Sequence, residues 1–121
     1  MTLSRNVRIA SCTLVLSVLA VLAPAYAQSP GRSYLYCVAS AEEPGGKAYL
    51  SGVYPGAWEQ AAADEESYFN HVSAKLDNAV ERSTTYCYAQ DTFDEAGLER
   101  EETQSFLKED GWEPVDVTWR P

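Results

Sequence analysis

Short apolar runs separated by a turn follow residue 33. Residues 34–40 and 47–54 are both rich in aromatic and β-branched side chains, and residues 43–46 between them read Glu-Pro-Gly-Gly. Strand-forming runs on either side of a glycine-rich turn are typical of a β-hairpin. The pattern therefore predicts that the first two strands form a hairpin.

Residues 57–76 carry their apolar side chains in one stripe of a helical wheel. Because helical spacing brings every third or fourth residue to the same side, this stretch predicts an amphipathic helix. Residues 83–90, which surround Cys87, again favour a strand. Helical and strand-like patterns therefore alternate after the hairpin.

A second helix is indicated by its end signals. Thr92 and Glu95 match the capping box, in which a hydroxyl and a carboxylate each satisfy a free backbone N–H, and Gly111 is a typical stop. We expect this helix over residues 93–110. Apolar side chains then alternate over residues 115–119, which predicts a last strand and the element order ββαβαβ.

The first 27 residues have the pattern of a signal peptide. Arg5 and Arg8 precede an apolar run over residues 9–23, and Ala25 and Ala27 are the small residues that a signal peptidase requires. An uncleaved membrane anchor is the alternative, although an anchor needs about 20 apolar residues. We expect cleavage after Ala27, which leaves no membrane span in the exported chain.

Cleavage would leave a flexible leader at residues 28–33 and a single domain at residues 34–121, in the periplasm or outside a bacterial cell. Cys12 would leave with the signal peptide, so only Cys37 and Cys87 remain. Two cysteines in a small exported protein are expected to form a disulfide, which would contribute roughly 4 kcal/mol by closing a loop of about 50 residues. A pair of free buried thiols is the alternative.

A disulfide restricts how the strands are arranged. Bridged Cα atoms must lie within about 7 Å, so the first and third strands, which carry Cys37 and Cys87, should be neighbours. Right-handed crossovers then give the strand order 2-1-3-4, with both helices on one face of a four-stranded sheet. The sequence therefore predicts an α+β two-layer sandwich whose second sheet face is uncovered.

The uncovered face would carry a cluster of tyrosines. Side chains alternate along a strand, so a buried disulfide places Tyr36, Tyr86 and Tyr88 together on the opposite side. Tyrosine combines apolar area with a polar tip and is enriched at recognition surfaces, so we expect these residues to form a binding site. In the reverse register, which the sequence leaves open, the tyrosines form the core and the disulfide faces solvent.

Two charged residues interrupt the apolar stripes of the predicted helices, Glu65 in the first and Arg100 in the second. Helices that pack side by side would bring these side chains together. We therefore expect an ion pair or a shared hydrogen-bond network with a structural role. A ligand-binding pocket built around the two charges is the alternative.

Composition and charge disfavour several classes of partner. The 121-residue chain is 45% hydrophobic and 22% charged, as expected for one soluble domain, and its formal net charge is −9. Loss of Arg5 and Arg8 with the signal peptide would lower the charge by two, to −11. Such acidity disfavours nucleic acids and anionic membranes, because both are bound mainly through basic side chains.

Candidate catalytic and metal-binding residues are sparse. The sole histidine, His71, falls on the polar side of the predicted first helix, without the nucleophile and orienting acid that catalysis requires. The acidic groups around residues 64–66 and 99–102 lack the spacing of a calcium loop, and no Cys-x-x-Cys pair is present for zinc. We therefore expect no catalytic residue, no cofactor and no metal, and an enzyme is the least favoured class of function.

Several short motifs lie in the last third of the chain. They are residues 86–89 (Tyr-Cys-Tyr-Ala), residues 92–96, Arg100, residues 111–112 (Gly-Trp) and residues 117–119. In these motifs the chain resembles small exported bacterial proteins of unknown function, which implies export and a single domain but no particular activity. Periplasmic lysozyme inhibitors share the size, the acidity and the single disulfide, but the sequence lacks their inhibitory loop signatures.

These patterns favour a monomeric, non-catalytic binding or accessory module that recognises a protein or a cell-wall glycan in the cell envelope. The small size, the expected export and the lack of catalytic groups all point in this direction. The alternative is an inhibitor or immunity protein for a basic secreted enzyme, since an acidic surface speeds association with a positively charged partner.

Overall fold

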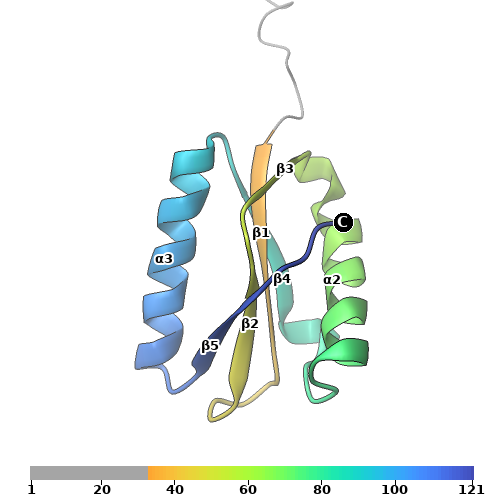
Figure 1. Cartoon of the computed structure of the whole chain (residues 1–121), viewed down its shortest axis with the longest axis vertical. Helices are drawn as coiled ribbons and strands as arrows, with labels where there is room; N and C mark the ends of the chain where they lie inside the picture. Colours follow the sequence, from red (N-terminus) through yellow and green to blue (C-terminus); the bar gives the residue numbers. More distant parts are fainter. Residues whose placement is uncertain (1–32) are drawn as a thin grey trace, which may run out of the picture. The chain divides into compact units, whose positions relative to one another are not determined.

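The computed structural model describes residues 33–121, which form five strands, two α-helices and two short 3₁₀ helices (Figure 1). The predicted signal peptide, residues 1–27, and residues 28–32 of the predicted leader lie outside the described residues. In chain order the elements are β1 (Ser33–Ser40), β2 (Lys47–Ser51), β3 (Tyr54–Gly56), η1 (Trp58–Gln60), α2 (Ala61–Lys75), η2 (Arg82–Thr84), β4 (Thr85–Gln90), α3 (Phe93–Glu109) and β5 (Glu113–Val117).

Each predicted helix and strand is present, with its ends shifted by a few residues. The helix α2 starts about one turn later than predicted, because residues 58–60 form the tighter turn of η1. The helix α3 begins where the capping box predicts, and the Thr92 hydroxyl accepts the backbone N–H of Glu95 at 3.1 Å. Gly111 follows this helix with a φ of 95°, a backbone conformation that glycine adopts without strain.

The five strands form one curled, mixed sheet around the central strand β1. On one side of β1, β2 and β3 pair antiparallel with successive parts of it, and β4 pairs antiparallel on the other side. The last strand, β5, lies parallel to β2. The predicted order 2-1-3-4 is therefore wrong, because the last strand pairs with the second predicted strand rather than with the third.

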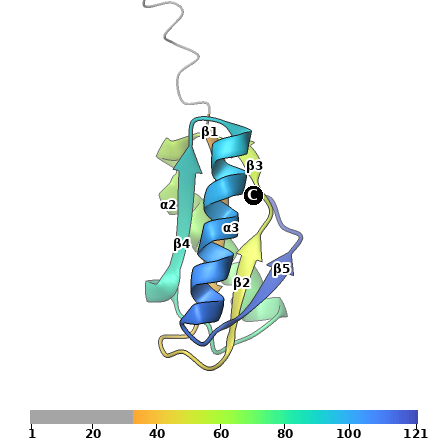
Figure 2. The ribbon, with the colours of Figure 1, turned by 90° about the vertical axis from the view of Figure 1, so that its left-hand side faces the viewer.

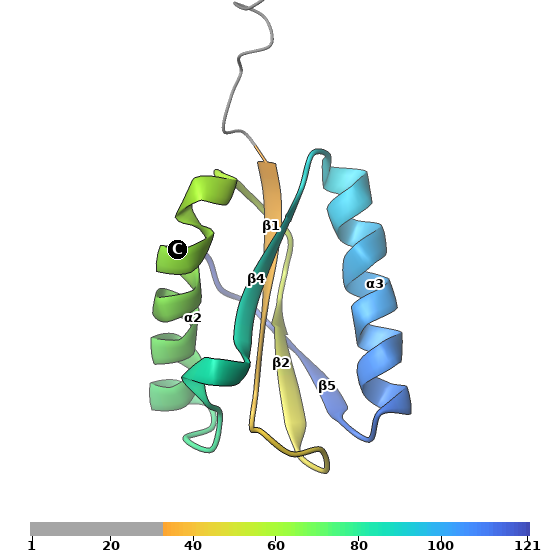
Figure 3. The same ribbon diagram turned by 180° about the vertical axis from the view of Figure 1, so that it is seen from behind.

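The two helices lie on opposite faces of the sheet (Figures 1 and 3), so the predicted single layer of helices with an uncovered sheet face is also wrong. The chain crosses from β3 to β4 through α2, and then returns over β1 and β2 to β5 through α3 (Figure 2). Two right-handed crossovers that run in opposite directions across a sheet must use opposite faces. This reversal of direction is the physical reason for both corrections.

Each face of β1 packs beneath one helix. Leu35 and Cys37 point toward α2, where they join Tyr68 and Val72 of that helix in the larger core. Tyr36 alternates with them along the strand and packs under α3. Burial of a large apolar side chain stabilises the fold by about 1.5–3 kcal/mol, so β1 contributes to the core through both faces.

A β-bulge separates β2 from β3. Residues 36–37 of β1 lie opposite three residues of the partner, 51–53. The extra residue interrupts regular pairing, and the Ser51 hydroxyl accepts the backbone N–H of Cys37 at 2.8 Å in its place. The predicted second strand, residues 47–54, is therefore one run of chain interrupted by a bulge.

Cys37 and Cys87 form the predicted disulfide across β1 and β4. The two residues are directly paired in the register, with their Cα atoms 4.0 Å apart. Their backbone N–H groups bond elsewhere, since Cys37 donates to Ser51 and Cys87 donates to the Glu65 carboxylate. Pairs that do not bond to each other bring opposing side chains closest together in an antiparallel sheet, which is why a disulfide fits at this position.

Candidate functional site

The tyrosines predicted as a binding site lie on the α3 side of the sheet, but only two of them reach solvent. Tyr36 is 1% exposed because α3 covers it, and its hydroxyl shares a hydrogen bond of 2.9 Å with the Thr103 hydroxyl. Tyr86 and Tyr88, on β4, are 48% and 40% exposed. The prediction that Tyr36 lies on an uncovered surface is therefore wrong, since its ring belongs to the core.

The three rings form a row from the core to the surface of β4. The ring centroids of Tyr36 and Tyr88 are 5.4 Å apart, and those of Tyr88 and Tyr86 are 6.3 Å apart. Both separations lie in the range of favourable aromatic pairs. The buried ring of Tyr36 thus supports Tyr88, whose outer part remains available for contact.

A cavity of about 360 Å³ lies beside this row, between α3 and β4. We call it the tyrosine groove, and it is lined by Tyr36, Tyr88, Glu99, Glu102, Thr103 and Phe106. The Phe106 side chain is 63% exposed, so it presents an apolar surface to solvent. The lining of the groove is aromatic and acidic, and none of the six residues is basic.

One of the two carboxylate oxygens of Glu99 has no hydrogen-bond partner among residues 33–121. Its Oε2 atom accepts a side-chain N–H of Gln90 at 2.9 Å. Its Oε1 atom is buried and has no hydrogen-bond partner among residues 33–121. Because buried polar atoms are nearly always hydrogen-bonded, this oxygen marks an unused acceptor position in the wall of the groove.

The phenol groups of the tyrosine groove are hydrogen-bond donors rather than bases. Burial raises the pKa of Tyr36 well above 10; the hydrogen bond with Thr103 offsets part of this effect, and the nearby carboxylate of Glu99 adds to it. Burial also raises the pKa of Tyr88, with further contributions from Tyr86 and Glu99. Both hydroxyls therefore stay protonated at neutral pH.

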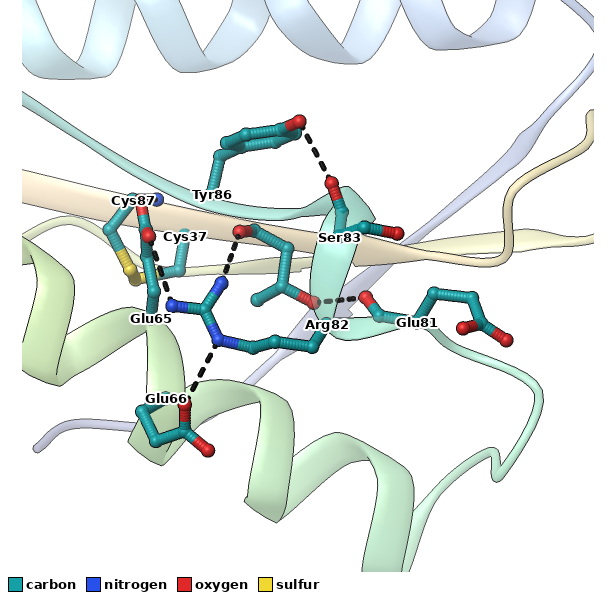
Figure 4. Close-up of polar contacts among 9 residues, drawn as sticks. Cys37, Glu65, Glu66, Glu81, Arg82, Ser83, Tyr86 and Cys87 are labelled. Carbon is teal, nitrogen blue, oxygen red and sulfur yellow. Dashed lines mark hydrogen bonds and ion pairs between the residues drawn. A yellow bond between two sulfur atoms is a disulfide. The ribbon is translucent and has the colours of Figure 1, made fainter.

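Glu65 pairs with Arg82 (Figure 4), whereas Arg100 pairs with Asp116. The Glu65 Oε1 atom lies 3.3 Å from Nη2 of Arg82, and its Oε2 atom accepts the backbone N–H of Cys87 at 3.0 Å. Arg82 also contacts Glu66 at 3.1 Å. The predicted pair of Glu65 with Arg100 is wrong because the two residues belong to helices on opposite faces of the sheet. The ion pair with Arg82 instead connects α2 to η2, which immediately precedes β4.

Arg100 turns inward from α3 toward β2 and β5. Its Nε atom donates to the carbonyl oxygen of Ser51 at 2.7 Å, and its Nη2 atom donates to the carbonyl oxygen of Leu50 at 3.3 Å. The same Nη2 atom lies 2.7 Å from the carboxylate of Asp116. The Arg100 guanidinium, which interrupts the apolar stripe of α3, is thus bonded to backbone carbonyl oxygens next to the bulge and to a carboxylate of β5.

No metal-binding group is formed within residues 33–121, since no three His, Cys, Asp or Glu side chains come together in a suitable cluster there. His71 is partly buried on α2 and does not line the tyrosine groove. Within the same range, none of the helices has the length and the apolar character needed to cross a bilayer.

Sequence reasoning missed the half of the groove that α3 provides. Glu99, Thr103 and Phe106 are spaced three or four residues apart, which places them along one side of a helix. That spacing is a detectable signal. The spacing indicates a binding groove only when α3 is known to lie beside β4, and the residue pattern does not give that position.

No protein-family model, curated protein or solved structure matches this chain. The resemblance to small exported bacterial proteins remains an expectation from the sequence.

Proposed function

We propose that the protein is a non-catalytic binding module of the cell envelope that recognises a protein or a cell-wall glycan through the tyrosine groove. The observation that carries this proposal is the combination of a half-exposed Tyr88 ring with the unpartnered Oε1 atom of Glu99 in one cavity. Aromatic rings offer area for sugars or apolar side chains, and a carboxylate orients a ligand by accepting its O–H or N–H groups.

The chemistry of the lining supports recognition rather than catalysis. The hydroxyls of Tyr36 and Thr103 bond to each other, and burial raises the pKa of Tyr36 above its ordinary value. The lining contains no histidine, lysine or cysteine, which are the side chains most suited to act as general base or nucleophile near neutral pH. The groove is therefore best suited to hold a ligand without changing it.

The location in the cell envelope rests on the predicted signal peptide. Residues 1–27 combine a basic start, an apolar run and the small residues Ala25 and Ala27. This combination is typical of a cleaved export signal. We therefore propose that the binding module acts in the periplasm or outside a bacterial cell. Its proposed state there is a monomer.

The acidic lining supports a second candidate, an inhibitor or immunity protein for a basic secreted enzyme. Glu99 and Glu102 both line the groove, and the formal net charge of the chain is −9. A lysine or arginine of such an enzyme could lie over the Tyr88 ring and pair with the acidic side chains of Glu99 and Glu102. This candidate predicts association that slows steeply as salt is added, whereas binding of a neutral glycan would change little.

Binding to defined partners tests the proposal. The purified protein is incubated with isolated cell-wall sacculi and, separately, with an extract of envelope proteins, and bound material is identified by mass spectrometry. We expect wild-type protein and Trp58→Ala to retain the same partner, because Trp58 is 60% exposed but does not line the groove. Tyr88→Ala and Glu99→Gln should lose it. Equal retention by all four proteins would show that the groove is not the binding site.

A further inference from the structure

A larger cavity, of about 620 Å³, lies where the β-bulge meets the segment that follows β5. We call it the arginine pocket, and its lining includes Val53, Arg100, Asp116, Val117, Trp119 and Arg120. It shares no lining residue with the tyrosine groove. The arginine pocket is therefore a separate site, and the inference that follows does not rest on the function proposed above.

The arginine pocket concentrates positive charge in an acidic chain. Residues 33–121 contain six basic side chains, Lys47, Lys75, Arg82, Arg100, Lys108 and Arg120. Two of these six line the pocket, whereas only Asp116 among the acidic residues does so. The local charge is thus opposite in sign to that of the whole chain, which favours an anionic ligand at this place.

The guanidinium of Arg100 is held ready for an anion. The side chain is 16% exposed, and the carbonyl oxygens of Ser51 and Leu50 fix its orientation. Its Nη1 atom has no hydrogen-bond partner in the described part of the chain. A planar guanidinium with a free donor in a fixed orientation suits a carboxylate, which accepts two parallel N–H bonds.

Asp116 occupies part of the place that such a ligand would take. Its carboxylate lies 2.7 Å from Nη2 of Arg100, but its side chain is 72% exposed. Ion pairs with so exposed a partner contribute little to stability, since water replaces the contact readily. The Asp116 side chain can therefore rotate away when another carboxylate arrives.

The remaining walls of the arginine pocket are apolar. Val53 and Val117 line it together with Trp119. The Trp119 ring packs edge-to-face against Tyr54 at 5.8 Å between centroids, and lies 4.8 Å from the ring of Tyr68. These contacts hold the indole in place, so the pocket offers a fixed apolar surface next to its charged end.

We propose that the arginine pocket binds a carboxylate attached to an apolar body, whose carboxylate displaces Asp116 from Arg100 while its body lies against Trp119. Arg120 supplies a second positive charge at the same site. The ligand could be a small organic acid or the carboxyl end of a polypeptide, because both present the same group.

Calorimetry and tryptophan fluorescence on the purified, disulfide-bonded protein test this proposal with phenylacetate as the probe. We expect phenylacetate to bind at least tenfold more tightly than phenylacetamide, which has nearly the same shape without the charge. An acetylated dipeptide ending in phenylalanine distinguishes the two sources, since tighter binding of the peptide would assign the site to a chain end. Equal binding of acid and amide, or binding of neither, would overturn the proposal.

Matched variants locate the site. Asp116→Asn should strengthen phenylacetate binding several-fold by removing the competing carboxylate, whereas Asp110→Asn, an equal change of charge at an exposed position outside the pocket, should leave it within twofold. Arg120→Met should weaken binding several-fold and leaves the bonds of Arg100 to β2 intact, so it remains informative if Arg100→Met fails to fold. Identical effects of the two aspartate variants would refute displacement at Arg100.

Discussion

The carboxylate of Glu65 accepts the backbone N–H of Cys87 at 3.0 Å, so a side chain of α2 satisfies a donor of the strand that carries the disulfide. In the described sheet β4 pairs only with β1, which leaves its other side without a strand partner. Exposed strand edges tend to pair with other chains. Glu65 covers this edge next to Cys87, and its other oxygen pairs with Arg82.

Replacement of Glu65 should therefore destabilise the protein more than replacement of its neighbour. Glu65→Ala leaves the Cys87 N–H without its acceptor, and we expect the free energy of unfolding to fall by about 1–3 kcal/mol. Glu66→Ala removes only a contact whose carboxylate is 60% exposed, so the loss should stay below about 0.5 kcal/mol. Urea denaturation monitored by circular dichroism measures both values, and equal losses would contradict the role of Glu65.

The two ends of the tyrosine row should respond very differently to truncation. Tyr36 is 1% exposed, so Tyr36→Ala should lower the free energy of unfolding by about 3–5 kcal/mol. Tyr86 is 48% exposed, and Tyr86→Ala should cost less than about 1 kcal/mol. Thermal denaturation of the two variants compares them directly. A folded, stable Tyr36→Ala protein would mean that α3 does not cover this ring in solution.

The disulfide should carry a large share of the stability. Cys37 and Cys87 are separated by 50 positions, so their bridge should contribute roughly 4 kcal/mol in the chain-entropy model. We expect Cys37→Ala with Cys87→Ala to lose about this amount in chemical denaturation. Mass spectrometry of the wild-type protein should find no thiol that can be alkylated without a reductant, and two such thiols would contradict the bridge.

Alkaline pH should unfold the protein through its buried tyrosines. Burial holds the pKa of Tyr36, Tyr54 and Tyr68 above 10, the value at which they ionise when unfolded. A raised folded pKa gives a stabilising effect that is complete below pH 10 and is lost as the pH rises beyond it, because the unfolded chain then releases protons that the folded chain retains.

Urea titrations at a series of pH values measure this dependence. The free energy of unfolding should change little through these groups from neutral pH to about pH 9, and then fall by up to about 1.4 kcal/mol per pH unit for each buried phenol. Tyr54→Phe removes one titrating group and should make the fall shallower. A slope that is the same with and without Tyr54 would contradict its assignment as a buried, protonated phenol.

Local signals in the sequence were sufficient for the elements but not for their arrangement. The capping box at Thr92 predicts the start of α3, and the bond from Glu95 to Thr92 confirms it. Such signals act over a few residues. The direction in which α3 crosses the sheet depends on which edge accepts β5, and β2 rather than β4 provides that edge.

In the candidate sites, too, the sequence predicts local features but not those that depend on how the helices are arranged. Alternation along β1 and β4 correctly separates Tyr36, Tyr86 and Tyr88 from the cysteines. The error about Tyr36 arose because a second helix covers that face. The error about Glu65 and Arg100 has the same origin, since residues that interrupt two apolar stripes meet only when both helices share a face. Both errors follow from the reversed crossover through α3.

The disulfide divides the domain into two parts with different covalent attachment. The strands β2 and β3 and the helix α2 lie between Cys37 and Cys87, whereas α3 and β5 follow Cys87 and are held only by packing and hydrogen bonds. Segments of this kind can open as a unit while the rest stays folded, and their amides then exchange hydrogen with solvent. Because α3 supplies Glu99 to one site and Arg100 to the other, a ligand bound at either site would favour the state in which α3 and β5 are folded onto the domain. Ligand binding would then be coupled to the local folding of this segment.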